Sequence, residues 1–209
     1  MKLTLFGGTG RTGQHLVQQA LRRNHQVVVL ARNPAKIAVQ HPNLSVVKGD
    51  VKDPASVEQA IAGADAVLSV LGPTSNQPTL EVSQGMAYIL AAMQKQGVRR
   101  LIITAGAGVG DPRDAPKLFN HVMNFLLKLM ARNVLADMAK AVELVRASDR
   151  DWTVVRLPMV TDDPKTGHVQ VGYVGQGMGP RIARADIAEF MLAQLTDLTY
   201  VRQSPAISN

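Results

Sequence analysis

The chain has 209 residues, of which 46% are hydrophobic and 19% charged, a balance typical of a soluble globular protein rather than a disordered or membrane one. It carries 23 Lys and Arg against 16 Asp and Glu, a formal net charge of +7, and it has no cysteine, which excludes disulfides, thiolate catalysis and cysteine-ligated metal centres. Its most apolar stretch, 119–130, is shorter than a membrane span and is interrupted by Lys128, so we expect no transmembrane helix. The N-terminus has one lysine and then a strand-like run and a glycine cluster, without an extended apolar region, so we expect no secretory signal and a cytoplasmic location.

Hydrophobic runs and helical periodicity alternate along the chain. In the first half this pattern predicts strands at 2–6, 26–31, 44–48 and 64–71, helices at 11–23, 53–61 and 79–96, and a helical turn opened by Asn33-Pro34. In the second half it predicts strands at 100–104 and 152–157, helices at 116–147 and 184–195, a strand or hairpin at 167–174 and an edge strand at 200–201.

The order of these elements predicts an α/β fold with a doubly wound, mostly parallel sheet of the Rossmann type. The length indicates a single domain, 1–209, and we expect the C-terminal part, about 105–209, to form a pocket for an acceptor molecule. Basic residues are spread without long runs and aromatic residues make up only 4%, so a nucleic-acid partner is poorly supported. We expect a small-molecule partner, no membrane partner, and a monomer or homodimer.

The segment GGTGRTG, residues 7–13, stands between the first predicted strand and the first predicted helix. Its spacing fits both G-x-G-x-x-G and G-x-x-G-x-x-G. Glycine permits a tight turn and close approach of a pyrophosphate, and the helix that follows offers free N–H groups and a partial positive charge. A tight structural turn is the simpler alternative, but the strand before and the helix after favour a phosphate-binding loop for a dinucleotide.

The residues at the end of the second strand predict which dinucleotide is bound. An NAD-binding loop is usually followed about 20 residues later by an acid that holds the ribose hydroxyls, and the segment 30–33 contains none. Arg32 can instead place its guanidinium against a 2′-phosphate, and Arg11 can approach the same group. A surface arginine is the alternative for Arg32, but the missing acid favours NADP(H).

Two further segments follow strands of the predicted sheet. Asp50, in Gly49-Asp50-Val51, could accept from the adenine amino group or cap the following turn. Leu71-Gly72-Pro73 ends a buried strand at the point where the strand order is expected to reverse, and backbone there must pass close to the cofactor.

These residues resemble the atypical NAD(P)H-binding branch of the short-chain dehydrogenase/reductase superfamily. The resemblance covers essentially the whole chain and rests on GGTGRTG, Arg32, GDV at 49–51, SVLG at 69–72 and the segment 143–158. The layout is most similar to the flavin reductase / biliverdin-IX-beta reductase group, which also has late segments like those at 179–181 and 186–192. It implies hydride transfer from NADPH to a planar acceptor such as a flavin (FMN or FAD), a quinone or a biliverdin-like tetrapyrrole.

The resemblance also implies roles for individual residues. Those that would hold the phosphates are Gly7, Thr9, Gly10, Arg11, Thr12 and Gly13, and the 2′-phosphate would meet Arg32. The adenine would lie by Asp50 and Val51, and the central ribose region by Leu71 and Gly72. Those that would lie by the nicotinamide are Thr104, Ala105, Pro158, Met159 and Val160.

The chain departs from the superfamily in its catalytic residues. Ordinary members use a Tyr-x-x-x-Lys pair, and none of the three tyrosines here is followed by lysine four residues later. Lys140 resembles the lysine of that pair, with a solvent-facing helical lysine as the alternative, but Ala136 occupies the tyrosine place. Gly106 and Met159 stand where the flavin reductase group has serine and histidine. The candidate catalytic residues are therefore Lys140 and Thr104. The alternative for Thr104 is an ordinary strand residue without a catalytic role.

The lack of the expected proton donors indicates which class of substrate the protein could reduce. An isolated carbonyl needs its alkoxide protonated, whereas a flavin or quinone accepts a hydride into a delocalised ring and can take the proton from solvent. Met159, Met178 and the segment 119–130 are candidate walls of such a pocket, with core packing or a dimer surface as alternatives. The histidines show no ligand spacing, so no metal site is expected.

Two other functions stay open. The first is an NADP(H)-binding regulatory or redox-sensing protein without turnover, because the expected acid is missing. The second, with less support, is a relative of the sugar-nucleotide epimerases and dehydratases, against which the absent tyrosine and the short C-terminal part argue.

Overall fold

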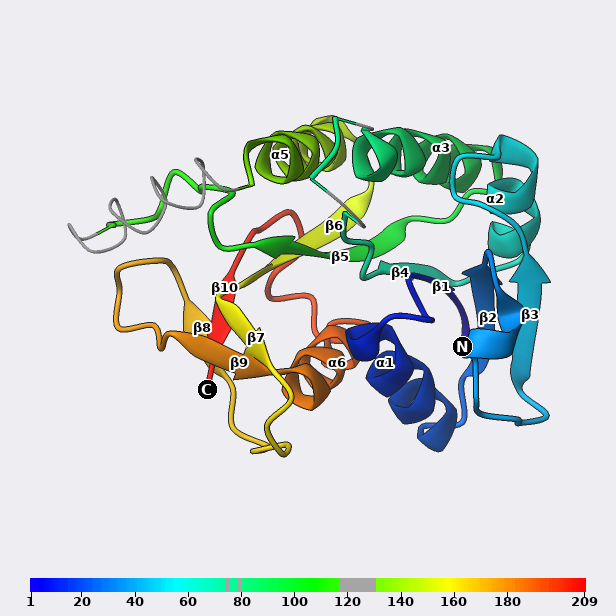
Figure 1. Ribbon diagram of the computed structural model, residues 1–209, viewed down its shortest axis with the longest axis horizontal. Helices are drawn as coiled ribbons and strands as arrows, with labels where there is room; N and C mark the ends of the chain where they lie inside the picture. The colour runs from blue at the N-terminus through cyan, green and yellow to red at the C-terminus, as the bar shows by residue number, and fades with distance from the viewer. Residues whose placement is uncertain (74–75, 79, 117–130) are drawn as a thin grey trace.

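The computed structural model describes residues 1–73, 76–78, 80–116 and 131–209. Strands and helices alternate along most of this part of the chain (Figure 1). In order, the elements are β1 (Lys2–Phe6), α1 (Arg11–Arg22), β2 (Gln26–Ala31), η1 (Pro34–Lys36), β3 (Leu44–Lys48), α2 (Pro54–Ile61), β4 (Ala66–Ser69), α3 (Glu81–Lys95), β5 (Arg100–Gly106), α5 (Arg132–Ala147), β6 (Asp151–Leu157), β7 (Met159–Thr161), β8 (Gln170–Gly172), β9 (Arg181–Ala183), α6 (Arg184–Ala193) and β10 (Ala206–Ser208).

Eight of these strands form one sheet in the order β3-β2-β1-β4-β5-β6-β10-β8. Neighbouring strands are parallel except for β10 and β8, which are antiparallel. The chain builds outward from β1 to β3, then returns to place β4 on the other side of β1. This reversal next to β1 opens a crevice at the carboxyl ends of the strands, where open α/β sheets bind ligands.

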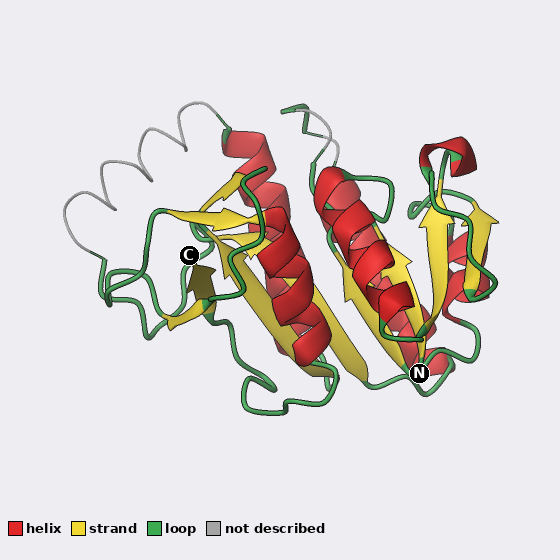
Figure 2. Ribbon diagram, turned by 90° about the horizontal axis from the view of Figure 1, so that it is seen from below, coloured by secondary structure: helices red, strands yellow, loops and turns green. Residues whose placement is uncertain are grey.

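Helices cover both faces of the sheet because strands such as Val27–Leu30 are apolar on both sides. Helices α2, α3 and α5 pack on one face through residues that include Val57, Ile89 and Val142. Helices α1 and α6 pack on the other face through residues that include Leu16 and Ile187. Figure 1 shows the two helical layers with the sheet between them, and Figure 2 shows from below that the helices run alongside the strands.

The predicted α/β Rossmann-like fold is confirmed, and three of the predicted strands, at 2–6, 26–31 and 44–48, have the predicted bounds. Strand β5 runs on to Gly106, whereas β4 ends at Ser69 rather than at 71. Strand β4 stops early because β1, its neighbour, turns away at Gly7, and the last bond between them joins Val70 N to the carbonyl of Phe6.

The C-terminal elements differ most from the prediction. The edge strand at 200–201 is wrong: these residues form a turn in which Val201 N donates to Leu198 O, and the last strand is β10, inside the sheet between β6 and β8. Strands β7 and β9, three residues each, pair with each other outside the main sheet and were too short to show a period. Of the helix predicted at 116–147, Arg132–Ala147 is confirmed as α5, and residues 117–130, including nearly all of the candidate pocket wall, lie outside the described residues.

Candidate functional site

A cleft of about 390 Å³ lies at the carboxyl ends of the strands around β1. It occupies the crevice between β1 and β4 where the strand order reverses. The residues predicted to bind the cofactor that line this cleft are Gly7, Thr9, Gly10, Arg32, Asp50, Val51, Leu71 and Gly72. The structure thus brings together the segments after β1, β2, β3 and β4, which are far apart in the sequence.

The loop between β1 and α1 requires glycine at two positions. Gly7 has φ +84°, and a Cβ there would lie 2.8 Å from the carbonyl oxygen of Val70. Its own carbonyl accepts from Gly10 N at 3.0 Å, and a Cβ at Gly13 would overlap that carbonyl oxygen. Gly13 is buried and does not line the cleft, so it lets α1 approach the loop closely.

The N-terminus of α1 is open to a ligand. Its N-cap is Gly10, with no side-chain capping bond and no acidic residue in the first turn. In contrast, Asp53 caps α2 through Ala55 N and Ser56 N, and Asp137 of α5 accepts from Val82 N and Ser83 N at the start of α3, both at 2.9 Å. The N–H groups at the start of α1 and its partial positive charge fit a phosphate. This geometry fits the diphosphate of a dinucleotide.

The wall after β2 is basic. Arg32 is exposed and lines the cleft, and Lys36 lies in the same wall because Asn33 Oδ1 accepts from Ala35 N at 3.1 Å and fixes the turn η1. The sequence interpretation missed Lys36, although its place four residues after Arg32 in a capped turn was a usable signal. No acid follows β2 along this wall, so its two cations suit a 2′-phosphate.

The wall after β3 holds the residues predicted to meet the adenine. Asp50 Oδ1 accepts from Lys52 N at 2.9 Å, so the turn-capping alternative is present in the structure, and a contact with adenine stays a prediction. Lys52 reaches across to Glu81 at the start of α3, with Nζ 3.3 Å from Oε1, and both residues line the cleft. This ion pair between the segment after β3 and the start of α3 was not predicted.

The residues predicted to lie by the nicotinamide are outside the cleft and continue along the same edge of the sheet. Strands β4, β5 and β6 are parallel neighbours, and Gly106 pairs with Leu157 at their carboxyl end. Thr104, Pro158 and Val160 are half-buried, Ala105 is buried, and Met159 is 61% exposed. This edge therefore extends the cleft from Gly72 toward the C-terminal part of the chain.

Three other predicted site residues lie apart from the cleft lining. Thr12 lies half-buried in the first turn of α1, and Lys140 is exposed on α5. Arg11 is directed to the end of β7, where Nη1 lies 2.7 Å from Asp162 Oδ2. The roles of all three stay predictions, and Asp162, which was not among the predicted site residues, lies beside Arg11.

The described residues that line the cleft include no tyrosine. Tyr88 OH accepts from Gln84 Nε2 at 3.1 Å on α3, and the Tyr200 ring lies 6.0 Å from that of Phe190. Tyr173 OH donates to Gln203 Oε1 at 3.2 Å, and burial raises the pKa of its phenol. The described structure therefore supplies no tyrosine at the cleft to act as proton donor.

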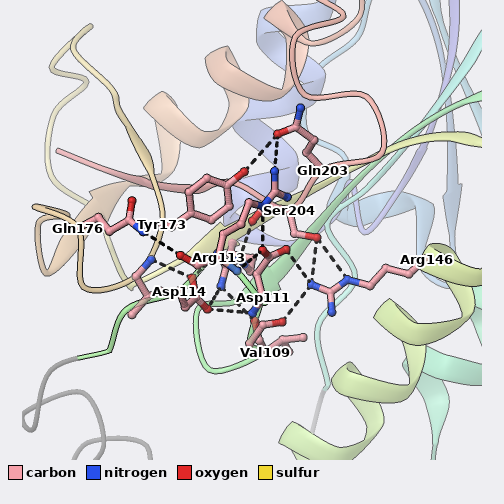
Figure 3. Close-up of polar contacts among 12 residues, drawn as sticks. Val109, Asp111, Arg113, Asp114, Arg146, Tyr173, Gln176, Gln203 and Ser204 are labelled. Atoms are coloured by element: carbon pink, nitrogen blue, oxygen red, sulfur yellow. Dashed lines mark hydrogen bonds and ion pairs between the residues drawn. The ribbon is translucent and has the colours of Figure 1, made fainter.

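The loop after β5, residues 107–116, is held by a polar network (Figure 3). Arg156 is fully buried and binds both carboxylate oxygens of Asp114, while Arg146 of α5 donates to Gly110 O at 3.0 Å. The guanidinium of Arg113 lies 4.4 Å from the centre of the Tyr173 ring and donates to Gln203 Oε1. These contacts attach the loop to α5, to β6 and to the segment before β10, beside the predicted nicotinamide site.

The described residues include no helix that could span a membrane and no cluster of metal ligands. No helix in this part of the chain is long and apolar enough to cross a membrane. Within the same residues, no group of three or more histidine, aspartate or glutamate side chains is placed to hold a metal ion.

Comparison with known proteins agrees with this geometry. A family model described as NAD(P)H-binding matches residues 7–198. The isoflavone reductase homolog IRL of Zea mays is 40% identical over 80 residues, which cover 34% of this chain and 26% of that protein. The chain spans between 26% and 62% of the length of the curated relatives that it matches.

Solved structures share the whole fold. A short-chain dehydrogenase/reductase from Veillonella parvula in complex with NADP has a TM-score of 0.82 and 20% identity, over 100% of this chain and 94% of that one. A candidate epimerase from Bacteroides thetaiotaomicron has a TM-score of 0.82 and 25% identity, over 99% of this chain and 96% of that one.

Proposed function

The chain belongs to the NAD(P)H-binding family, and on this premise we propose that it is an NADPH-dependent reductase of a planar acceptor such as a flavin or a quinone. The observation that carries the proposal is the cleft, in which an uncapped α1 and the cations Arg32 and Lys36 face one crevice. The complex of the Veillonella parvula protein with NADP supports the choice of cofactor, and the reductases and dehydrogenases among the curated relatives support an oxidoreductase.

Different residues along the sheet edge would bind different parts of the cofactor. The start of α1 would hold the diphosphate, and Arg32 with Lys36 would hold the 2′-phosphate. When bound, NADPH supplies a hydride, and a flavin or quinone can take the accompanying proton from water. The protein would then need to orient two rings against each other rather than to donate a proton.

The acceptor would lie beside the edge formed by the ends of β5 and β6, in the C-terminal part of the chain. The loop 107–116, which hydrogen bonds attach to α5 and β6, and the exposed Met159 would border it. Thr104 and Lys140 are the side chains we propose to test for a role in turnover. A flavin, a quinone and a biliverdin-like tetrapyrrole all fit this reaction class.

A regulatory or redox-sensing protein that binds NADP(H) without turnover is the second candidate. It is favoured by the lack of a tyrosine along the cleft and by the exposed position of Lys140 on α5. The epimerase and dehydratase alternative rests on fold neighbours such as the candidate epimerase of Bacteroides thetaiotaomicron. That chemistry would also require an acid or base at the nicotinamide.

Purified protein is mixed with NADPH and, in turn, FMN, FAD, a benzoquinone and biliverdin, and the loss of absorbance of NADPH is followed. The proposal expects oxidation well above the rate without protein for at least one acceptor, with NADH much slower at equal concentration. Tight binding of NADPH with no turnover on any acceptor would favour the regulatory alternative. Thr104→Val and Lys140→Met, measured in the same assay, test the two candidate catalytic residues.

A further inference from the structure

Asp162, which follows β7, lies between arginines from two different helices. Its Oδ2 is 2.7 Å from Nη1 of Arg11, the first residue of α1, and its Oδ1 is 3.3 Å from Nε of Arg184, the first residue of α6. One carboxylate therefore connects the phosphate-binding loop to the segment that follows the predicted nicotinamide residues.

The two contacts of Asp162 differ in kind. The side chains of Arg11 and Asp162 are 72% and 60% exposed, and an exposed ion pair of this sort is weak because water and salt screen it. The Arg184 side chain is only 10% exposed, and its Nε and Nη1 are buried and make no hydrogen bond to any described residue. A buried guanidinium with unmet donors would gain from a closer carboxylate.

We propose that Asp162 is a positioning residue that changes partners when the cofactor binds. Arg11 leaves Asp162 for the diphosphate, which is drawn to the open start of α1, and Asp162 then closes on the unmet donors of Arg184. The exchange replaces the screened Arg11–Asp162 ion pair with two charge-assisted contacts, one from Arg11 to the diphosphate and one from Arg184 to Asp162. Each of these charged groups then has a partner of opposite charge. This inference rests on the cofactor binding of the proposed function.

The exchange has a consequence for the acceptor side. Asp162 follows Thr161 of β7 directly, and β7 pairs with β9, which runs straight into α6 at Arg184. A shift of Asp162 toward Arg184 therefore tightens the small β7–β9 sheet against α6. Occupancy of the diphosphate site would thus set the position of Met159 and Val160, which are predicted to border the nicotinamide.

The test is a calorimetric titration of the full chain with NADP⁺ and NAD⁺ at low ionic strength. In an Arg184→Met background, where Arg11 is the remaining arginine beside Asp162, Asp162→Asn removes only the competitor for Arg11 and is expected to tighten the binding of both cofactors about two- to fivefold, the range of a surface ion pair. Asp163→Asn removes the same charge one residue further on and is the matched control, expected to change either affinity by much less. Equal tightening by both variants would show a general charge effect and overturn the proposal.

Further variants isolate each partner. In an Arg11→Gln background, Asp162→Asn is expected to have no effect on affinity, and a gain that persists there would remove Arg11 from the exchange. Arg184→Met removes the second partner of Asp162 and is expected to weaken the binding of both cofactors severalfold. Unchanged affinity would contradict the role of Arg184. Thermal melts of each variant confirm that it is folded.

Comparison of the two cofactors tests the destination of Arg11. A gain for NADP⁺ alone would place Arg11 on the 2′-phosphate and overturn its assignment to the diphosphate. The titrations need no acceptor. Failure to reduce flavins or quinones would therefore contradict the proposed reductase activity, whereas this inference is tested by the titrations alone.

Discussion

The carboxylate of Asp114 receives two hydrogen bonds from Arg156, from Nη1 at 2.6 Å and from Nη2 at 2.7 Å. Arg156 is fully buried on β6, and its Nε also donates to Ser204 O at 2.7 Å. One side chain of the central sheet thus holds both the loop after β5 and the segment that leads into β10. Figure 3 shows how Arg113 and Tyr173 gather around the same loop.

Arg156→Met is expected to lower the free energy of unfolding by about 3–5 kcal/mol, because it leaves the mostly buried Asp114 without its partner. Urea denaturation followed by circular dichroism measures the change. Arg99→Met is the control, since Arg99 also pairs with an aspartate, Asp151, but is 55% exposed, and it should cost less than about 1 kcal/mol. If both variants lost a similar amount of unfolding free energy, burial would not explain the contribution of the Arg156–Asp114 pair.

Stability should fall in acid through Asp114. Burial alone would raise the pKa of this carboxyl, but the hydrogen bonds from Arg156 and from Asp111 N outweigh it and the pKa is lowered. A group with a lower pKa in the folded state contributes stability above its unfolded pKa, about 4, and loses it as the pH falls through the folded value. Asp114→Asn should therefore show a shallower decrease in unfolding free energy below about pH 4, and a slope equal to that of the wild type would count against this assignment.

Gly13→Ala is expected to abolish cofactor binding and to destabilise the fold by about 1–3 kcal/mol, because the added methyl group would overlap the Gly7 carbonyl and push α1 from the loop. Fluorescence titration with NADPH and thermal unfolding measure the two effects. Gly110→Ala, where a Cβ meets no atom within 4 Å, should leave both nearly unchanged. Retained binding in Gly13→Ala would show that the loop can adjust.

Arg32→Ala is expected to lower the affinity for NADPH by about 10- to 100-fold and that for NADH only slightly. The reason is that the guanidinium would bind the extra phosphate with charge-assisted hydrogen bonds. Lys36→Ala should act in the same direction. Competition titrations give both affinities, and Arg22→Ala, an exposed arginine at the far end of α1, is the control. If NADPH and NADH lose affinity equally, Arg32 does not read the 2′-phosphate.

The sequence was sufficient to predict the order of elements in the first half of the fold and several of the segments that line the cleft. The strands there are short segments rich in apolar residues, followed within a few residues by glycine or by a capping residue such as Asn33 or Asp53, so local signals and the final structure agree. The positions of Gly7, Arg32 and Asp50 at one edge follow from parallel strands alone, since their carboxyl ends must meet there.

Only the tertiary structure decided which polar groups are partners. Asp162 pairs with Arg11 across 151 positions of the chain, and Asp137 caps α3 from α5, contacts that no local period encodes. It also decided that β10 lies inside the sheet, because three residues gain strand geometry only from neighbours on both sides. Local propensity specified the longer elements and the glycine loop after β1, whereas long-range charge pairing and burial specified the short C-terminal strands and the surroundings of that loop.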